Sequence, residues 1–375
     1  MLSTTTRAFG APMTYIQGPG EFDNLETYSR VFSKKVFFLI DGFLYEAFSE
    51  RIANVYRGTG SEYVAEKCNG ECSRSEIDRV AELINQSSAG LVVGVGGGKT
   101  IDITKMAANE RNLPYFIAPT SASTDAPVSC IAVIYTDEGI HDGTVSLKRA
   151  AEIVLMDSEI IAKAPIRLFR AGMADALATW FEAQTRERSD TPNNIGKGFR
   201  RTRAGMAIAR LSYEILMQDG LKALQALENG VITEAVENII ETNTLLSGLG
   251  FQNTGCSVAH AIQAGLAELP EAHGFMHGEK VAFGTVCGFI FENTPMETVD
   301  PVMRFMVEAG LPVTLEELNV KPTYENAWKI ADKVVNRNKT IYSEPMAINI
   351  DTVLASVLAA NALGVTYKSG KGLLM

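Results

Sequence analysis

Three consecutive glycines end an apolar run in the stretch VVGVGGGKT at residues 92–100. A strand that leads into glycines and then into a helix start presents backbone N–H groups to an anion. A triphosphate-binding loop needs a glycine where this chain has Val93, and the third glycine of a dinucleotide fingerprint falls on Lys99. Neither motif is complete, but three glycines exceed what a tight turn requires. We therefore interpret the stretch as a phosphate-binding turn.

Three of the four histidines fall within residues 260–277. At helical spacing, His260 shares a stripe with small and partly polar residues, whereas the apolar residues of the same segment form a separate face. His277 lies at or near the start of the next predicted helix. Two imidazoles on successive helices could therefore meet, as in catalytic zinc sites. We interpret His273 and His141 as residues that bond backbone carbonyls, with His141 on a hairpin or loop.

A third ligand would have to be a carboxylate, and Asp175 in the stretch GMADALATWFEA is a candidate. It lies on a predicted helix beside a separate apolar stripe. A carboxylate in this position is a solvated surface residue as often as it is a ligand, so its spacing alone does not select it. His273 and His277 also have the i, i+4 spacing of zinc-binding helices, but Gly274 between them weakens a helical interpretation.

The pattern of apolar residues predicts two domains of different classes, one for the glycine stretch and one for Asp175 and the clustered histidines. Apolar runs separated by helical patterns predict an α/β domain with a parallel sheet, with strands at 36–40, 91–95, 114–120, 131–135 and 151–157. From Pro165 onward the pattern predicts only helices, including 172–187, 199–218, 221–227, 231–249, 256–269 and 278–292. We predict an α/β dinucleotide-binding domain at 1–164 and an all-α metal-binding, catalytic domain at 165–375, with the active site in the cleft between them.

Composition restricts the partners. A chain of 375 residues with a net charge of −10 has no broad basic surface for nucleic acid or an anionic membrane. An odd number of cysteines, five, fits reduced thiols better than a disulfide framework, although Cys68 and Cys72 could together bind a metal. No secretory signal or uninterrupted membrane span is evident. We expect a soluble, cytoplasmic protein.

The sequence resembles the glycerol dehydrogenase branch of the iron-containing alcohol dehydrogenase superfamily. Matching stretches occur in family order along nearly the whole chain, at 94–105, 118–129, 133–139, 171–183, 257–266 and 277–285. The resemblance implies NAD as cofactor, and Asp41 at the end of the first strand favours NAD over NADP because it repels a 2′-phosphate. The cofactor-binding residues that it implies are Asp41, Gly96, Gly97, Gly98, Lys99, Thr120, Ser123, Ser129, Ile131 and Tyr135.

The resemblance also implies a metal bound by Asp175, His260 and His277, which leaves a position open for substrate. The implied metal is zinc, and iron(II) stays open because these ligands accept either ion. In such a site the metal would lower the pKa of a substrate hydroxyl, so that the carbon could pass hydride to NAD. The implied substrate is a small polyol, glycerol, oxidised to dihydroxyacetone. Asp125 orients a neighbouring hydroxyl, and Phe251 either lines the pocket or packs in the core. The resemblance further suggests a homo-oligomer.

Two other activities on the same architecture stay open, a glycerol-1-phosphate dehydrogenase and a lyase resembling dehydroquinate synthase. Both hold a substrate phosphate, which Asp125 would repel. A P-loop phosphotransferase is disfavoured by Val93, and a non-catalytic metal-binding scaffold would need no glycine loop.

Overall fold

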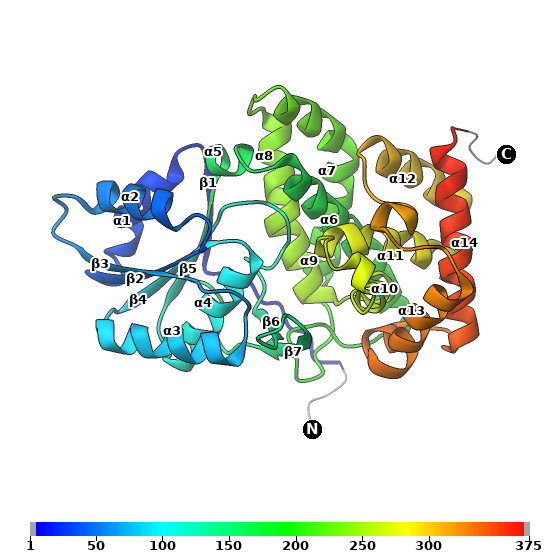
Figure 1. Ribbon diagram of the computed structural model, residues 1–375, viewed down its shortest axis with the longest axis horizontal. Helices are drawn as coiled ribbons and strands as arrows, with labels where there is room; N and C mark the ends of the chain where they lie inside the picture. Colours follow the sequence, from blue (N-terminus) through cyan, green and yellow to red (C-terminus); the bar gives the residue numbers. More distant parts are fainter. Residues whose placement is uncertain (1–4, 371–375) are drawn as a thin grey trace. The chain divides into compact units, whose positions relative to one another are not determined.

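The computed structural model describes residues 5–370, which divide into two compact units (Figure 1). The α/β unit contains Gly10–Pro165 and the short segment Gly230–Ile232. The helical unit contains residues 5–9, Ile166–Asn229 and residues 233–370. The predicted first domain began at residue 1, but residues 5–9 belong to the helical unit. The backbone explains this difference, because Arg200 N donates to Thr6 O at 2.8 Å and Ala8 N donates to Arg200 O at 3.2 Å.

The α/β unit is built on a six-stranded parallel sheet in the order β1-β8-β5-β4-β2-β3. Its strands are β1 (Thr14–Gly18), β2 (Lys35–Ile40), β3 (Glu62–Lys67), β4 (Leu91–Gly96), β5 (Tyr115–Pro119) and β8 (Ile153–Asp157). The unit's helices are η1 (Glu21–Asn24), α1 (Leu25–Ser29), α2 (Tyr45–Tyr56), α3 (Arg74–Ser87), α4 (Gly98–Glu110) and α5 (Ser158–Ala162). Every residue of β4, β5 and β8 is buried, which explains their continuous apolar runs.

Successive residues of each strand face opposite sides of the sheet. On one side, Phe38, Val93 and Phe116 form a hydrophobic cluster with residues of η1, α1 and α2. On the other side, Phe37 and Val92 are fully buried where α3 and α4 cover the sheet (Figure 1). Both faces are therefore covered, as predicted for a parallel sheet.

One predicted strand of this sheet has a different position. Ile131–Tyr135 (β6) pairs antiparallel with His141–Ser146 (β7) in a separate two-stranded hairpin. Its burial pattern explains the difference, because β6 is only partly buried and β7 is largely exposed. His141 lies on this hairpin, as the sequence indicated.

The helical unit contains the long helices α6 (Ile166–Ser189), α7 (Arg203–Glu228), α11 (His277–Phe291) and α14 (Ile350–Lys368). Between and around them lie α8 (Glu234–Glu241), η2 (Thr242–Leu246), α9 (Ser247–Thr254), α10 (Val258–Leu266), η3 (Pro270–Ala272), α12 (Met296–Glu308), η4 (Glu316–Leu318), α13 (Tyr324–Arg337) and η5 (Thr340–Ser343). Helix α11 is buried along most of its length and packs against α6, α10 and α14. It therefore forms the centre of the unit.

Helix α14 has the length and hydropathy of a membrane span, although the sequence analysis anticipated no such segment. It packs against α11 and α13. Its buried residues include the polar Asn361, whose Oδ1 accepts a hydrogen bond from Leu315 N at 2.7 Å. Its apolar composition therefore matches a helix of the unit's core.

Candidate active site

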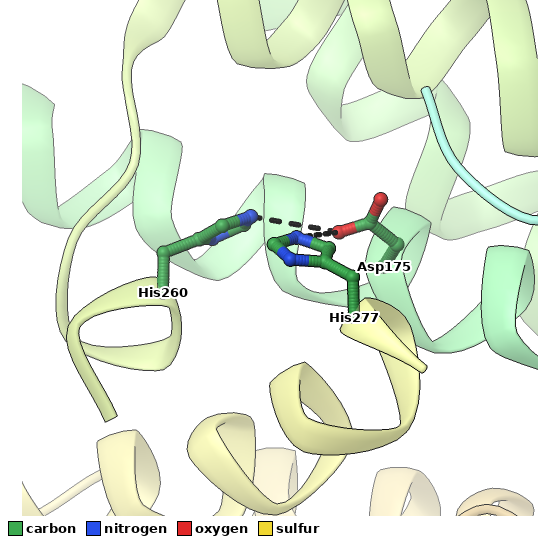
Figure 2. A group of neighbouring side chains, drawn as sticks. All are labelled: Asp175, His260 and His277. Carbon is green, nitrogen blue, oxygen red and sulfur yellow. Dashed lines mark ion pairs between the residues drawn. The ribbon is translucent and has the colours of Figure 1, made fainter. Parts of the chain in front are cut away.

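Asp175, His260 and His277 lie together although they come from three different helices, α6, α10 and α11 (Figure 2). Asp175 Oδ1 is 3.5 Å from His260 Nε2 and 3.4 Å from His277 Nε2. One donor atom from each residue lies within 4.8 Å of the others. The structure thus brings together the three residues that the sequence analysis named as metal ligands.

The surroundings of Asp175 fit a cation. Its side chain is 1% exposed, and neither carboxylate oxygen accepts a hydrogen bond. A buried carboxylate that accepts no hydrogen bond is costly, so this site favours a positive charge beside it. Two ligand atoms each about 2.1 Å from a tetrahedral ion are about 3.4 Å apart, which matches both measured distances. His277 is the most exposed of the three, at 44% of its side chain, so the group is open on that side.

The ionisation of this group reflects opposite charges in a buried place. Burial raises the pKa of Asp175, but His277 and His260 beside it lower that pKa by more than burial raises it. The pKa of Asp175 is therefore below its usual value. Burial also lowers the pKa of His260, but the neighbouring carboxylates of Glu182 and Asp175 outweigh it and raise the pKa well above the usual value. Both shifts favour an ionised Asp175 carboxylate beside a positively charged His260 ring.

The sequence analysis missed Glu182, which is 3% exposed on α6. Its Oε2 is 2.7 Å from His260 Nδ1. Its Oε1 accepts backbone hydrogen bonds from Ser257 N at 2.7 Å and His260 N at 3.0 Å, at the start of α10. The available signal was its spacing, since it follows Asp175 by seven residues, two turns along the same helix face.

Main-chain contacts hold together the three helices that carry Asp175, His260 and His277. A Cβ at Gly278, next to His277, would overlap the carbonyl oxygen of Ala171 on α6. A Cβ at Gly284 would overlap the carbonyl oxygen of Ala259, next to His260. Helix α11 can approach α6 and α10 this closely only with glycine at these two positions.

The remaining aromatic and histidine candidates have distinct positions. Phe251 on α9 stacks on His260, with ring centroids 6.0 Å apart and an angle of 24° between the ring planes. It therefore lies beside the group of Asp175, His260 and His277 rather than elsewhere in the core. His273 is exposed and its Nε2 lies 3.1 Å from Ala267 O, outside the three-residue group.

The glycine stretch joins β4 to α4 in the α/β unit. Its glycines serve two purposes. A Cβ at Gly94 would overlap Thr104 Oγ1, and one at Gly96 would lie 2.8 Å from Asp41 Cβ, so the packing of the unit itself requires these two. A Cβ at Gly97 would meet nothing within 4 Å, and one at Gly98 would meet only Thr124 Cγ2 at 3.9 Å. Nothing in the described chain fills the space beside Gly97 and Gly98, as a cradle for a ligand requires.

Two predicted cofactor residues flank this turn. Asp41 follows β2, and its Oδ1 accepts a hydrogen bond from Phe43 N at 3.0 Å. Lys99 is exposed and its ammonium pairs with the Glu71 carboxylate. In this structure the partner of Lys99 is therefore an acidic side chain.

A buried lysine that the sequence analysis overlooked ties α4 to the segment after β5. Lys105 is fully buried, and its Nζ donates to Asp102 Oδ1 at 3.1 Å, to Ala126 O at 2.5 Å and to Ile131 O at 2.8 Å. Asp102 Oδ2 in turn accepts from Val133 N at 3.0 Å. One ion pair thus fixes segment 126–133 relative to the glycine turn.

The other predicted cofactor and substrate residues lie between the end of β5 and the end of β6. Thr120 N donates to Gly96 O at 3.2 Å, which holds the end of β5 beside the glycine turn. Asp125 and Ser129 are buried, and Ser129 Oγ donates to Ala126 O. The hydroxyl of Ser123 pairs with Ser121, and Ile131 and Tyr135 are the first and last residues of β6. Burial raises the pKa of Tyr135 to about 12, so its hydroxyl stays protonated at neutral pH.

The five cysteines are free thiols in the structure. Cys68 and Cys72 are buried, and burial raises the pKa of both. High thiol pKa values disfavour the thiolate that a metal would need, so their proximity in sequence does not indicate a metal site.

Comparison with known proteins places these features in a family. The family model described as iron-containing alcohol dehydrogenase matches residues 12–158. A glycerol dehydrogenase of Citrobacter freundii is 39% identical over 94% of this chain and 97% of its own. A glycolaldehyde reductase of Halobacterium salinarum is 35% identical over 96% of this chain and 98% of its own. The crystal structure of a probable glycerol dehydrogenase from Sinorhizobium meliloti 1021 matches with a TM-score of 0.90 and 43% identity, covering 96% of this chain and 99% of that one.

Proposed function

Because the chain belongs to the iron-containing alcohol dehydrogenase family, we propose that it oxidises glycerol, or a related vicinal diol, with NAD as the hydride acceptor. Dihydroxyacetone is the product when glycerol is the substrate. The observation that carries this proposal is the buried Asp175 carboxylate, which accepts no hydrogen bond and faces two imidazoles at the spacing of metal ligands.

Asp175, His260 and His277 would hold the metal, which we propose is zinc. A divalent cation bound there would lower the pKa of a substrate hydroxyl, and the nicotinamide would accept the hydride. The single carboxylate neutralises only one of the two charges of the cation, so the site stays electropositive toward an oxygen ligand. Phe251 would cover one side of this site and limit the access of water, because its ring lies against His260.

In the α/β unit, Gly97 and Gly98 leave room for a pyrophosphate at the start of α4. Gly96 shapes this turn, and Lys99 would exchange Glu71 for a phosphate oxygen. Asp41 would accept hydrogen bonds from the adenosine ribose and disfavour a 2′-phosphate. We propose that the remaining cofactor contacts come from Thr120, Ser123, Ser129, Ile131 and Tyr135, and that Asp125 orients a second hydroxyl of the diol.

The proposal is tested with purified protein, zinc and NAD, by following NADH absorbance with glycerol, 1,2-propanediol, glycerol 1-phosphate and simple primary alcohols. We expect turnover with the vicinal diols. We also expect its loss on treatment with a chelator and its return when zinc is added. Activity only with glycerol 1-phosphate would favour a phosphorylated substrate, and no NADH from any diol would refute the proposal.

A second candidate is reduction of a small hydroxyaldehyde, because the Halobacterium salinarum relative is named a glycolaldehyde reductase. The same residues serve either direction, since the steps of a reversible hydride transfer are shared. Comparing kcat/KM for glycerol oxidation with that for glycolaldehyde reduction by NADH distinguishes the two candidates.

A further inference from the structure

Glu182 uses both of its carboxylate oxygens at His260, and we infer that it is a positioning residue that keeps the ring proton of His260 on Nδ1 and so turns Nε2 toward the metal. This inference rests on the proposed metal site. Glu182 contacts His260 and the start of α10, and it is not itself one of the three proposed ligands.

The hydrogen-bond chemistry leaves one arrangement for the neutral ring. An ionised carboxylate is only an acceptor, so Nδ1 of His260 must donate to Glu182 Oε2 across 2.7 Å. The lone pair of a neutral imidazole is then on Nε2, the nitrogen that lies 3.5 Å from Asp175 Oδ1. Nε2 therefore has the free lone pair that a metal ligand needs.

The start of α10 keeps Glu182 in the acceptor role. Oε1 accepts from the N–H groups of Ser257 and His260, in the first turn of the helix, where free N–H groups favour a negative charge. The same two bonds fix how the carboxylate is turned. One face of the His260 ring is also fixed, because the ring of Phe251 stacks on it.

Helix α6 carries both Asp175 and Glu182, so one rigid element presents a metal ligand and the group that orients another ligand. Seven residues span two helical turns, which places both side chains on the same face of α6. The separation between the two carboxylates is therefore set by regular helix geometry.

The test is Glu182→Gln, which keeps the size and shape of the side chain. The amide oxygen can still accept from the two backbone N–H groups, and those donors keep the NH2 group turned toward His260 Nδ1. That nitrogen must then accept, its proton moves to Nε2, and the lone pair that would bind the metal is lost. We expect the affinity for Zn²⁺, measured by competition with a chelator, to fall about 10–100-fold.

The matched control is Asp219→Asn on α7. Asp219 is also buried in the helical unit and also loses a charge, but its partners are Lys222 and Asn238. We expect Zn²⁺ affinity within about threefold of the wild type. In a His260→Ala background, Glu182→Gln should have no further effect on Zn²⁺ affinity, since Glu182 acts through that ring.

A second measurement needs no variant and decides the question even if Glu182→Gln fails to fold. With only four histidines in the chain, ¹⁵N NMR of the zinc-loaded wild type can assign the ring proton of His260. We expect it on Nδ1. A proton on Nε2, or unchanged Zn²⁺ affinity in Glu182→Gln, would overturn the role of Glu182 while leaving the proposed function intact. A wild type that binds no Zn²⁺ would overturn both.

Discussion

Replacing Lys105 with methionine should strongly destabilise the α/β unit, although Lys105 is outside the hydrophobic core described above. Its ammonium makes three hydrogen bonds in a fully buried place, to Asp102 and to the carbonyls of Ala126 and Ile131. Methionine keeps the apolar stem but provides no donor. The variant would therefore bury a carboxylate and two carbonyl oxygens that have lost a partner.

The expected cost follows from these contacts. Removing one partner of a buried ion pair costs about 3–5 kcal/mol, and a buried carbonyl that loses its donor adds about 1–3 kcal/mol. The total free-energy cost is limited because Asp102 can take up a proton once Lys105 is gone. Burial already raises the pKa of Asp102, and Lys105 is the main opposing influence, so in the variant this pKa rises further. We expect a loss of about 4 kcal/mol at neutral pH.

The loss should depend on pH. In the variant, folded Asp102 holds a proton that the unfolded chain releases near its ordinary pKa of about 4. The variant's free energy of unfolding is therefore highest below about pH 4, where both states hold the proton. It falls as the pH rises from there through the raised pKa of folded Asp102. The difference between wild type and variant should consequently be larger at pH 8 than at pH 5.

The assay must report on the α/β unit itself, because both tryptophans, Trp180 and Trp328, belong to the helical unit. Hydrogen exchange of peptides from α4 and residues 126–133, measured across a urea series, meets this need. Lys99→Met is the matched control on the same helix, since its exposed pair with Glu71 should contribute at most about 1 kcal/mol.

The double variant Asp102→Leu/Lys105→Met tests the cause of the effect. It removes the stranded carboxylate, so it should be more stable than Lys105→Met alone. A single variant that exchanges as slowly as the wild type, or a double variant that is less stable than the single one, would refute the reasoning.

Three further predictions address other parts of the chain. Gly97→Ala should keep the wild-type Tm but weaken NAD binding, whereas Gly94→Ala should cost about 1–3 kcal/mol because its Cβ overlaps Thr104; normal NAD affinity in Gly97→Ala would contradict this. Burial raises the pKa of Glu344 to about 8 from 4.5, so Tm should fall between about pH 5 and about pH 8, where the unfolded chain has released this proton and the folded protein still holds it. Glu344→Gln should flatten that slope, and an unchanged slope would speak against this residue. Asp175→Asn should leave the protein with little bound zinc in elemental analysis but with normal NAD affinity, and full zinc content would rule out the proposed site.

The strands that the sequence predicted correctly are those buried on both faces, since their apolar runs are continuous. β1 and β3 escaped prediction because they are the edge strands of the sheet and are only partly buried. Their residues, TYIQG and EYVAEK, mix polar with apolar types. Which strand β6 pairs with depends on contacts between segments that are distant in sequence. Its apolar run alone therefore assigned it to the wrong sheet.

Helix boundaries show a similar limit. The sequence predicted a break near Gly220, but α7 continues through it. A Cβ there would lie 2.8 Å from Phe305 and 2.9 Å from Met173, so this glycine serves close helix packing. Nothing local distinguishes such a glycine from one that ends a helix.

The sequence allowed us to predict the candidate metal ligands and the glycine turn. It did not allow us to predict Glu182 and Lys105, which hold neighbouring groups in place. Residue types and spacing indicated the glycine turn and drew attention to His260, His277 and Asp175, and the resemblance then named these three as metal ligands. Glu182 and Lys105 lie inside matching stretches but were not singled out, because a charged residue on a helix is usually exposed. Their importance appears only when α10 and the segment after β5 fold against them.

The contacts of Gly278 and Gly284 have a consequence for how freely this protein can change. The backbone of α11 touches the backbones of α6 and α10, so these backbone contacts, and not side-chain packing alone, set the distances between Asp175, His260 and His277. We therefore expect substitutions that repack the rest of the helical unit to change those distances little. A mutagenesis library for new substrates can therefore vary the helical core widely, provided that these two glycines are left unchanged.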